Sequence, residues 1–139
     1  MTTYNQIWQC FLDNCGYKRS DIPQIDEIRY SMINNAKDYY NNIMQNYTES
    51  YQSNIQCADL TETLNVQLTS DELLIFANIL KLIFLKNRHS EFISIYNTFA
   101  KELGISNYKA QADAKLLVVK DQEQEVYRLI TNGLDDWEM

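Results

Sequence analysis

Apolar residues recur along most of this chain at the three- and four-residue spacing of amphipathic helices. Residues 3–14 place four large apolar side chains on one helical face, and Gly16 follows as a typical helix stop. Pro23, a residue favoured in the first helical turn, precedes a longer stripe of the same kind over residues 24–53. The pattern therefore predicts a short first helix and a long second one.

Residues 73–85 form the most apolar segment and predict a helix that is buried on all sides. Eleven of these thirteen residues are apolar, with Asn78 and Lys81 as the exceptions. Thr69 and the two acids that follow it suit a helix N-terminus. A bilayer span takes about 20 residues, so the run is too short to cross a membrane. We expect it to be the central helix of the domain.

Two more helices are predicted after this segment. The polar residues 87–90 interrupt the apolar run, and a fourth helix over 91–103 ends at Gly104. The last helix runs over 108–131 and stops at the Asn-Gly pair 132–133.

Residues 57–69 have a different pattern, in which Leu64, Val66 and Leu68 alternate with polar residues, as in a strand. One such run cannot make a sheet, so we predict an extended connection that is open to pairing with a neighbouring chain. With only 3 Gly and 1 Pro, the chain lacks the turn residues of a β-rich fold. The predicted fold class is all-α: a single domain, residues 1–139, made of a bundle of about five helices around a central, fully apolar helix, with a short acidic tail at 134–139.

Charge and residue types argue against several functions. The net charge of −7 disfavours a protein that holds phosphate backbones or anionic membranes. His89 is the only histidine, no nucleophile turn or phosphate loop is present, and the three cysteines lack disulfide or zinc spacing. His89 itself is expected just after a helix, against the terminal carbonyls. We predict no enzyme activity, no cofactor and no metal.

Two stretches carry a family-like pattern. In residues 21–43 an acidic residue opens a helix with spaced Ile, Ala and Tyr: Asp26, Ile28, Ile33, Ala36, and Tyr39 or Tyr40. In residues 68–91 an apolar helix ends in an aromatic-x-x-Asn-Arg sequence followed by an acid: Phe84, Asn87, Arg88 and Glu91. Together, over about half of the chain, they resemble the head-to-tail connector (neck adaptor) proteins of tailed bacteriophages, although Phe84 stands where tyrosine is more usual and residues 105–139 match no pattern.

The resemblance implies a structural virion protein of the phage neck, assembled in the host cytoplasm. Its subunits would form a homo-oligomeric ring that links the portal protein to neighbouring neck or tail proteins. An acidic lumen would let DNA pass nearby without specific binding, because like charges repel.

Two functions from other classes remain open on the sequence. A small acidic regulatory protein that binds and inhibits a host nucleic-acid enzyme would fit the charge equally well. A small enzyme of unrecognised type would need a buried polar cluster, for which Asn78 and Lys81 are the candidates.

The acidic tail is the predicted partner-binding segment. Tryptophan is a frequent interface anchor, and acids flank the one in this tail. We hypothesise that the tail docks on a partner subunit and its acids meet a basic rim, with folding back onto its own domain as the alternative. The residues are Leu134, Asp135, Asp136, Trp137 and Met139.

Overall fold

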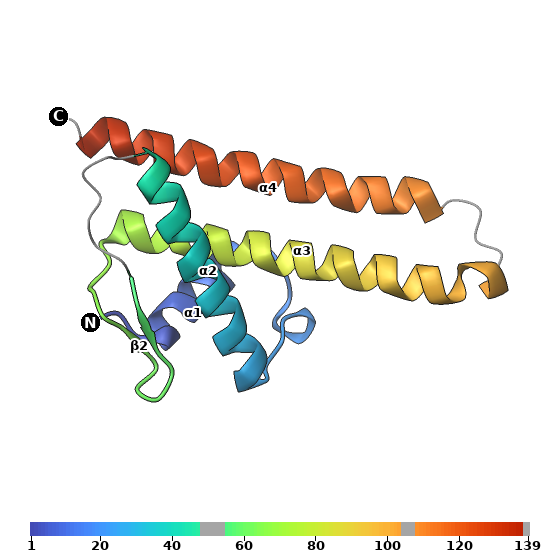
Figure 1. Cartoon of the computed structure of the whole chain (residues 1–139), viewed down its shortest axis with the longest axis horizontal. Coiled ribbons are helices and arrows are strands. Elements are labelled where there is room, and N and C mark those ends of the chain that lie inside the picture. Colours follow the sequence, from blue (N-terminus) through green and yellow to red (C-terminus); the bar gives the residue numbers. More distant parts are fainter. Residues whose placement is uncertain (48–54, 104–107, 138–139) are drawn as a thin grey trace.

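The computed structural model describes the backbone of residues 1–47, 55–103 and 108–137, and within these ranges the fold is mostly helical (Figure 1). The four α-helices and the other elements follow in chain order: α1 (Tyr4–Asn14), a short 3-10 helix η1 (Arg19–Asp21), α2 (Asp26–Tyr47), the strands β1 (Cys57–Ala58) and β2 (Thr63–Leu64), α3 (Ser70–Leu103) and α4 (Tyr108–Trp137). Helix α2 begins two residues later than predicted, and residues 48–54 of the predicted helix lie outside the described residues.

Side-chain caps explain where the first and third helices begin. The Thr3 hydroxyl accepts a hydrogen bond from the Gln6 backbone N–H at 3.2 Å, and the Gln6 amide oxygen accepts one from Thr3 N at 2.9 Å. Thr69 and Glu72 form the same reciprocal pair at the start of α3, at 3.2 and 3.0 Å. Each pair satisfies two N–H groups that have no partner within the helix. At the other end of α1, Gly16 takes the left-handed conformation expected after a helix, with φ of 76°.

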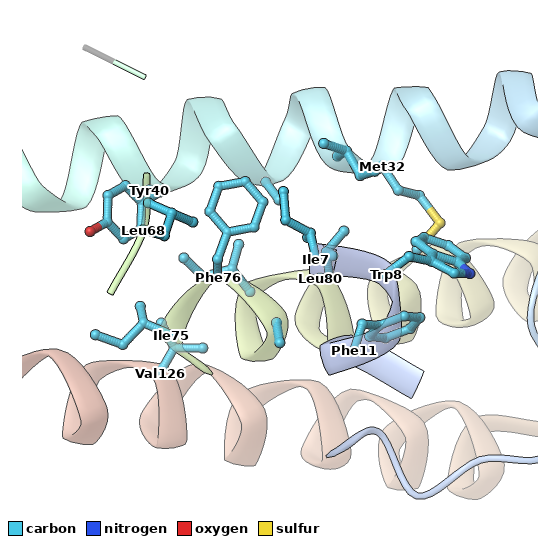
Figure 2. Packing of buried hydrophobic residues seen from close by; sticks show 14 of the residues in the cluster. Ile7, Trp8, Phe11, Met32, Tyr40, Leu68, Ile75, Phe76, Leu80 and Val126 are labelled. Atoms are coloured by element: carbon cyan, nitrogen blue, oxygen red, sulfur yellow. The ribbon is translucent and has the colours of Figure 1, made fainter. Parts of the chain in front are cut away.

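Helix α3 is the element on which the other helices pack. It contacts α1, α2 and α4, and α4 runs antiparallel beside it while α2 crosses it (Figure 1). None of residues 72–85 is exposed. Figure 2 shows Phe76 and Leu80 of α3 between side chains of α1 and α2, and the Phe76 ring lies 5.9 Å from that of Tyr40.

The prediction of five helices is wrong in one respect, because the predicted third and fourth helices are a single helix. Helix α3 continues from Ser70 to Leu103 through the polar residues 87–90. These residues include neither glycine nor proline, so nothing interrupts the backbone hydrogen bonds there. Polar side chains at these positions mark an environment that is less covered, rather than a helix end.

The extended conformation predicted within residues 57–69 is confirmed by two short strands, but the expectation that this run cannot make a sheet is wrong. Strands β1 and β2 pair antiparallel within the chain, with Cys57 opposite Leu64 and Ala58 opposite Thr63. The N-terminal residues complete this small sheet, because Leu64 N donates to Thr2 O at 2.8 Å and Thr2 N donates to Val66 O at 3.0 Å. The second partner of this segment, the N-terminal residues, is therefore about sixty residues away in sequence, and a local pattern does not reveal it.

Helix α4 extends through the predicted stop at residues 132–133 and ends at Trp137. A glycine ends a helix when it adopts the left-handed conformation; in a helix interior it costs only about 1 kcal/mol relative to alanine. The prediction that the tail leaves the helix is therefore wrong for residues 134–137. Met139 lies outside the described residues, as do the side chains of Leu134, Asp135, Asp136 and Trp137.

Of the helices described, none is long and apolar enough to cross a membrane.

We expect Leu80→Ala to destabilise the fold by roughly 2–5 kcal/mol, because Leu80 is fully buried and its truncation leaves a cavity at the packing centre of α3. Chemical denaturation measures this cost. The control is Leu117→Ala on α4, an exposed leucine whose truncation should cost less than about 0.5 kcal/mol. Equal costs for the two variants would show that α3 is not where the stability resides.

Candidate protein-binding surface

The side of α4 that faces α3 is a regular stripe of buried residues. Val119, Gln122, Val126 and Ile130 follow one another at three- and four-residue steps and are all buried. Gln122 is the polar member, and its amide Nε2 donates to the backbone oxygen of Asn78 at 2.9 Å and to its side-chain oxygen at 3.2 Å. This hydrogen bond fixes the position of α4 along α3 at one point.

The Gln122 bond also settles the role of the polar residues inside the apolar segment of α3. Asn78 uses its own side-chain N–H to donate to Leu74 O at 2.9 Å and uses its oxygens for Gln122. Its hydrogen-bonding groups are therefore occupied by structural partners. Lys81 is partly buried on the same helix and exerts only a minor charge effect on Glu125, lowering its pKa. Within the described part of the chain, no hydrogen bond joins Asn78 to Lys81.

Three consecutive apolar residues of α4 are exposed, and we call them the α4 apolar surface: Leu116, Leu117 and Val118, with exposed fractions of 37, 59 and 46%. Successive residues of a helix point about 100° apart, so these three cover more than half of its circumference. Since Val119 faces α3, Leu117 points almost directly away from it. Val118 also lines a small pocket with Tyr17, a residue of the connection that follows α1.

The sequence analysis predicted a helix over residues 108–131 but did not single out the α4 apolar surface. The available signal was the run Leu-Leu-Val-Val at 116–119. A helix that packs on one neighbour needs one apolar residue in each three or four, so four in a row exceed what α3 is able to cover. An apolar group of this kind on a surface is typical of a contact site for another molecule.

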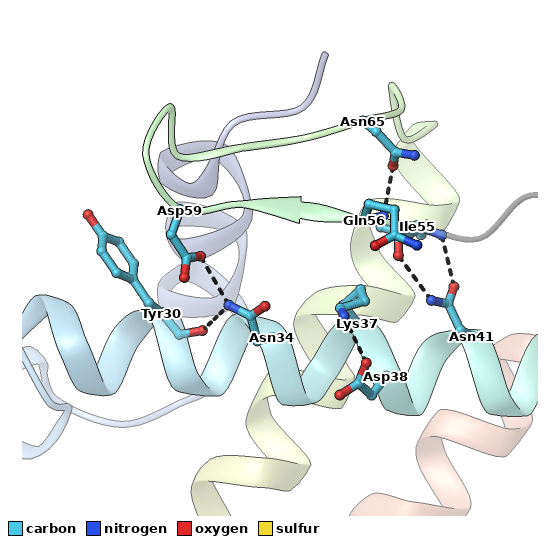
Figure 3. Close-up of polar contacts among 9 residues, drawn as sticks. All are labelled: Tyr30, Asn34, Lys37, Asp38, Asn41, Ile55, Gln56, Asp59 and Asn65. Atoms are coloured by element: carbon cyan, nitrogen blue, oxygen red, sulfur yellow. Dashed lines mark hydrogen bonds and ion pairs between the residues drawn. The ribbon is translucent and has the colours of Figure 1, made fainter.

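A second network of hydrogen bonds holds the β-hairpin against α1 and α2, and Figure 3 shows the contacts with α2. Tyr4 donates from its hydroxyl to Asp59 at 2.5 Å, and Asn34 donates to the same carboxylate at 3.1 Å. Asn41 and the backbone of Ile55 exchange two hydrogen bonds at 3.1 and 3.2 Å. These groups use their donors and acceptors on each other, so this network is structural.

The turn of this hairpin contains a residue in an unusual conformation. Glu62 has φ of 54°, in the left-handed region that non-glycine residues seldom adopt. Its carboxylate accepts a hydrogen bond from the Tyr30 hydroxyl and lies 3.8 Å from the Arg29 guanidinium. These contacts with α2 hold the turn in place, and they raise the pKa of Tyr30 through its bond to Glu62.

Two of the three thiols are less acidic than a free cysteine. Burial raises the pKa of Cys57 and of Cys10, which keeps both in the neutral form. Burial also raises the pKa of Tyr4, and the bond to Asp59 adds to this effect. Across the part of the chain that the structure describes, no three Cys, His, Asp or Glu side chains gather as metal ligands.

His89 is not at a helix end as predicted, because α3 continues past it to Leu103. It lies in the middle of that helix and lines a small pocket. The partly exposed Glu125 accepts two hydrogen bonds from Arg128 at 2.6 and 2.9 Å, and these bonds lower the pKa of Glu125. This carboxylate therefore belongs to an ion pair on the surface.

Comparison with known proteins relates the chain to prophage proteins. Residues 1–135 match the model of a family described as YomZ prophage protein. The SPbeta prophage-derived uncharacterized protein YomZ of Bacillus subtilis (strain 168) is 37% identical over 137 residues, which are 99% of each of the two chains. No solved structure matches.

The resemblance to neck adaptor proteins is therefore wrong, because the family that matches almost the whole chain is a different one. The structure explains why the pattern misled. Ile33, Ala36, Tyr40 and Phe84, four of the residues that carried it, are buried core positions. Apolar residues at helical spacing occur in any packed helix, so they identify a fold class rather than a family.

We expect stability to fall as pH rises from about 8 to 10.5, because the unfolded chain releases its thiol and phenol protons near their usual pKa values and the folded chain does not. The pKa values of Tyr4, Cys10 and Cys57 are raised in the folded chain. The free energy of unfolding is therefore highest at pH values below the pKa values of these groups in the unfolded chain, and it falls as the pH rises above them. Urea unfolding across this range measures the effect. A Tyr4→Phe variant should lose less stability between about pH 9 and 10.5, and an unchanged slope would contradict the assignment to Tyr4.

Proposed function

Since the chain belongs to the YomZ prophage protein family, we propose that it is a non-catalytic prophage protein that acts by binding another protein through the α4 apolar surface. The observation that supports this function is the exposure of Leu116, Leu117 and Val118 in succession on a helix whose buried stripe already covers α3. Water-exposed apolar area of this kind is stabilised when a second surface covers it.

The energetic gain available at this surface is large enough to matter for binding. Complete burial of a leucine or valine side chain contributes about 1.5–3 kcal/mol relative to its exposed state. Leu117 and its two neighbours keep exposed fractions of 59, 37 and 46% within the chain, so about half of this gain is left for a partner.

The position of the surface favours binding without rearrangement. Leu117 points away from α3, and helices α1 and α2 make their main contacts with α3 rather than with α4; Figure 1 shows the α3–α4 pair extending past them. A partner that covers Leu117 therefore displaces no element of the described fold. Such interfaces commonly form with little backbone change.

The identity of the bound protein is a separate question. A location in the virion neck beside the portal protein stays a prediction, as does inhibition of a host nucleic-acid enzyme. The docking role of Leu134, Asp135, Asp136, Trp137 and Met139 also stays a prediction, now with residues 134–137 as the last part of α4.

We expect Leu117→Glu to weaken partner binding at least tenfold, because it places a charge where apolar contact is needed; a tenfold loss corresponds to about 1.4 kcal/mol. The measurement compares proteins recovered by cross-linking and quantitative mass spectrometry from cells that carry the prophage. The matched control is Leu60→Glu, which makes the same change at a fully exposed leucine in the β-hairpin turn.

The proposal requires a protein that the Leu60→Glu chain retains and the Leu117→Glu chain loses, with both variants melting near the wild-type temperature. If both variants retain the same partners, the α4 apolar surface is not the binding site. If both variants lose all partners, binding depends on the net charge of the chain rather than on the α4 apolar surface, because both substitutions add one negative charge.

A further inference from the structure

We propose that Arg88, His89 and Lys115 form a binding site for a small oxyanion, that is, a carboxylate or phosphate group. The three side chains line a pocket of about 210 Å³ together with Tyr17, Leu85 and Val118. The pocket lies where α3, α4 and the connection that follows α1 meet. This inference does not depend on protein binding by the α4 apolar surface.

Arg88 is held in place by aromatic rings rather than by an acid. Its guanidinium carbon lies 5.1 Å from the ring centre of Tyr17 and 5.5 Å from that of Phe84. Within the described part of the chain no carboxylate oxygen comes within 4 Å of its nitrogens, and its Nη1 atom is buried without a hydrogen-bond acceptor. A buried charged donor without a partner is costly, whereas the planar guanidinium is well suited to two parallel bonds with an oxyanion.

Lys115 repeats this arrangement on the facing helix. Its Nζ atom lies 5.0 Å from the ring centre of Phe92, and no described carboxylate is within ion-pair distance. Elsewhere Arg29, Lys37 and Lys86 each have an acidic partner. In a chain with 19 acids and 12 basic residues, two unpaired cations beside one pocket repel each other unless an anion lies between them.

The neighbouring pocket on the other side of Arg88 has a different character. It is larger, about 590 Å³, and its lining includes the acids Asp21 and Glu91. An anion would be repelled there, so the smaller pocket is the one that suits it. Leu85 and Val118 give that pocket apolar walls, which would contact a small apolar group attached to the oxyanion.

The size of the pocket limits the ligand. Pockets for drug-sized ligands have volumes of about 300–1,000 Å³, and 210 Å³ is below this range. A ligand with one oxyanion and at most a single small ring fits the volume and the lining. Inorganic phosphate, benzoate and phenyl phosphate therefore serve as probes, the first for the charge alone and the others for charge with an apolar group.

The test is a titration of the full chain with each probe at constant ionic strength, followed by calorimetry and by amide chemical shifts. We expect saturable binding, with shifts grouped at residues 85–92 and 115–118, and tighter binding of phenyl phosphate than of inorganic phosphate. Arg88→Gln and Lys115→Gln should each weaken it about tenfold or more. Lys120→Gln, the same change at an exposed lysine of α4, should leave it unchanged.

Absence of saturable binding by all three probes would overturn the proposal. Equal weakening by Lys120→Gln and Lys115→Gln would also overturn it, because binding would then follow net charge rather than the pocket. Arg88 packs on two rings, so its variant can lose stability; Lys115→Gln then decides the outcome alone. Unchanged partner recovery by Lys115→Gln would separate this site from the function proposed for the α4 apolar surface.

Discussion

The need to cover the apolar part of α3 on all sides organises this molecule. Residues 72–85 are nowhere exposed, and one neighbouring helix is able to bury only one side of them. Helices α1, α2 and α4 each pack on α3 and together meet this need. The β-hairpin that connects α2 to α3 in the chain is hydrogen-bonded to the N-terminal residues that precede α1.

The elements with strong local signals were predictable from the sequence. Helices α1 and α3 begin at capping pairs three residues apart, and their apolar spacing is that of a helix. The errors have a common physical cause, because they concern features decided by distant contacts or by small backbone preferences. Polar residues at 87–90 and a glycine at 133 weaken a helix without ending it, and β2 pairs with residues at the start of the chain.

The candidate sites were harder to predict than the fold. Gln122 and Asn78 are far apart in sequence, as are Arg88 and Tyr17, and their contacts exist only once the helices are packed. The α4 apolar surface is visible in the sequence as a run of apolar residues. Whether a given leucine in such a run faces a neighbouring helix or water depends on how many helices surround it. Trp137, the most conspicuous candidate in the sequence, lies on a segment whose backbone is still helical.

The single long helix α3 crosses two environments, and this has a consequence for local unfolding. Its first half lies in the shared core, whereas in the described ranges 86–95 and 109–118 no side chain is fully buried. Local opening costs less free energy where few apolar contacts are lost. Amide hydrogen exchange should therefore be graded along one continuous helix, slow from residue 75 to 85 and faster beyond. A molecule that binds the part of α3 beyond residue 85 would slow amide exchange there. The whole helix would then open together with the core.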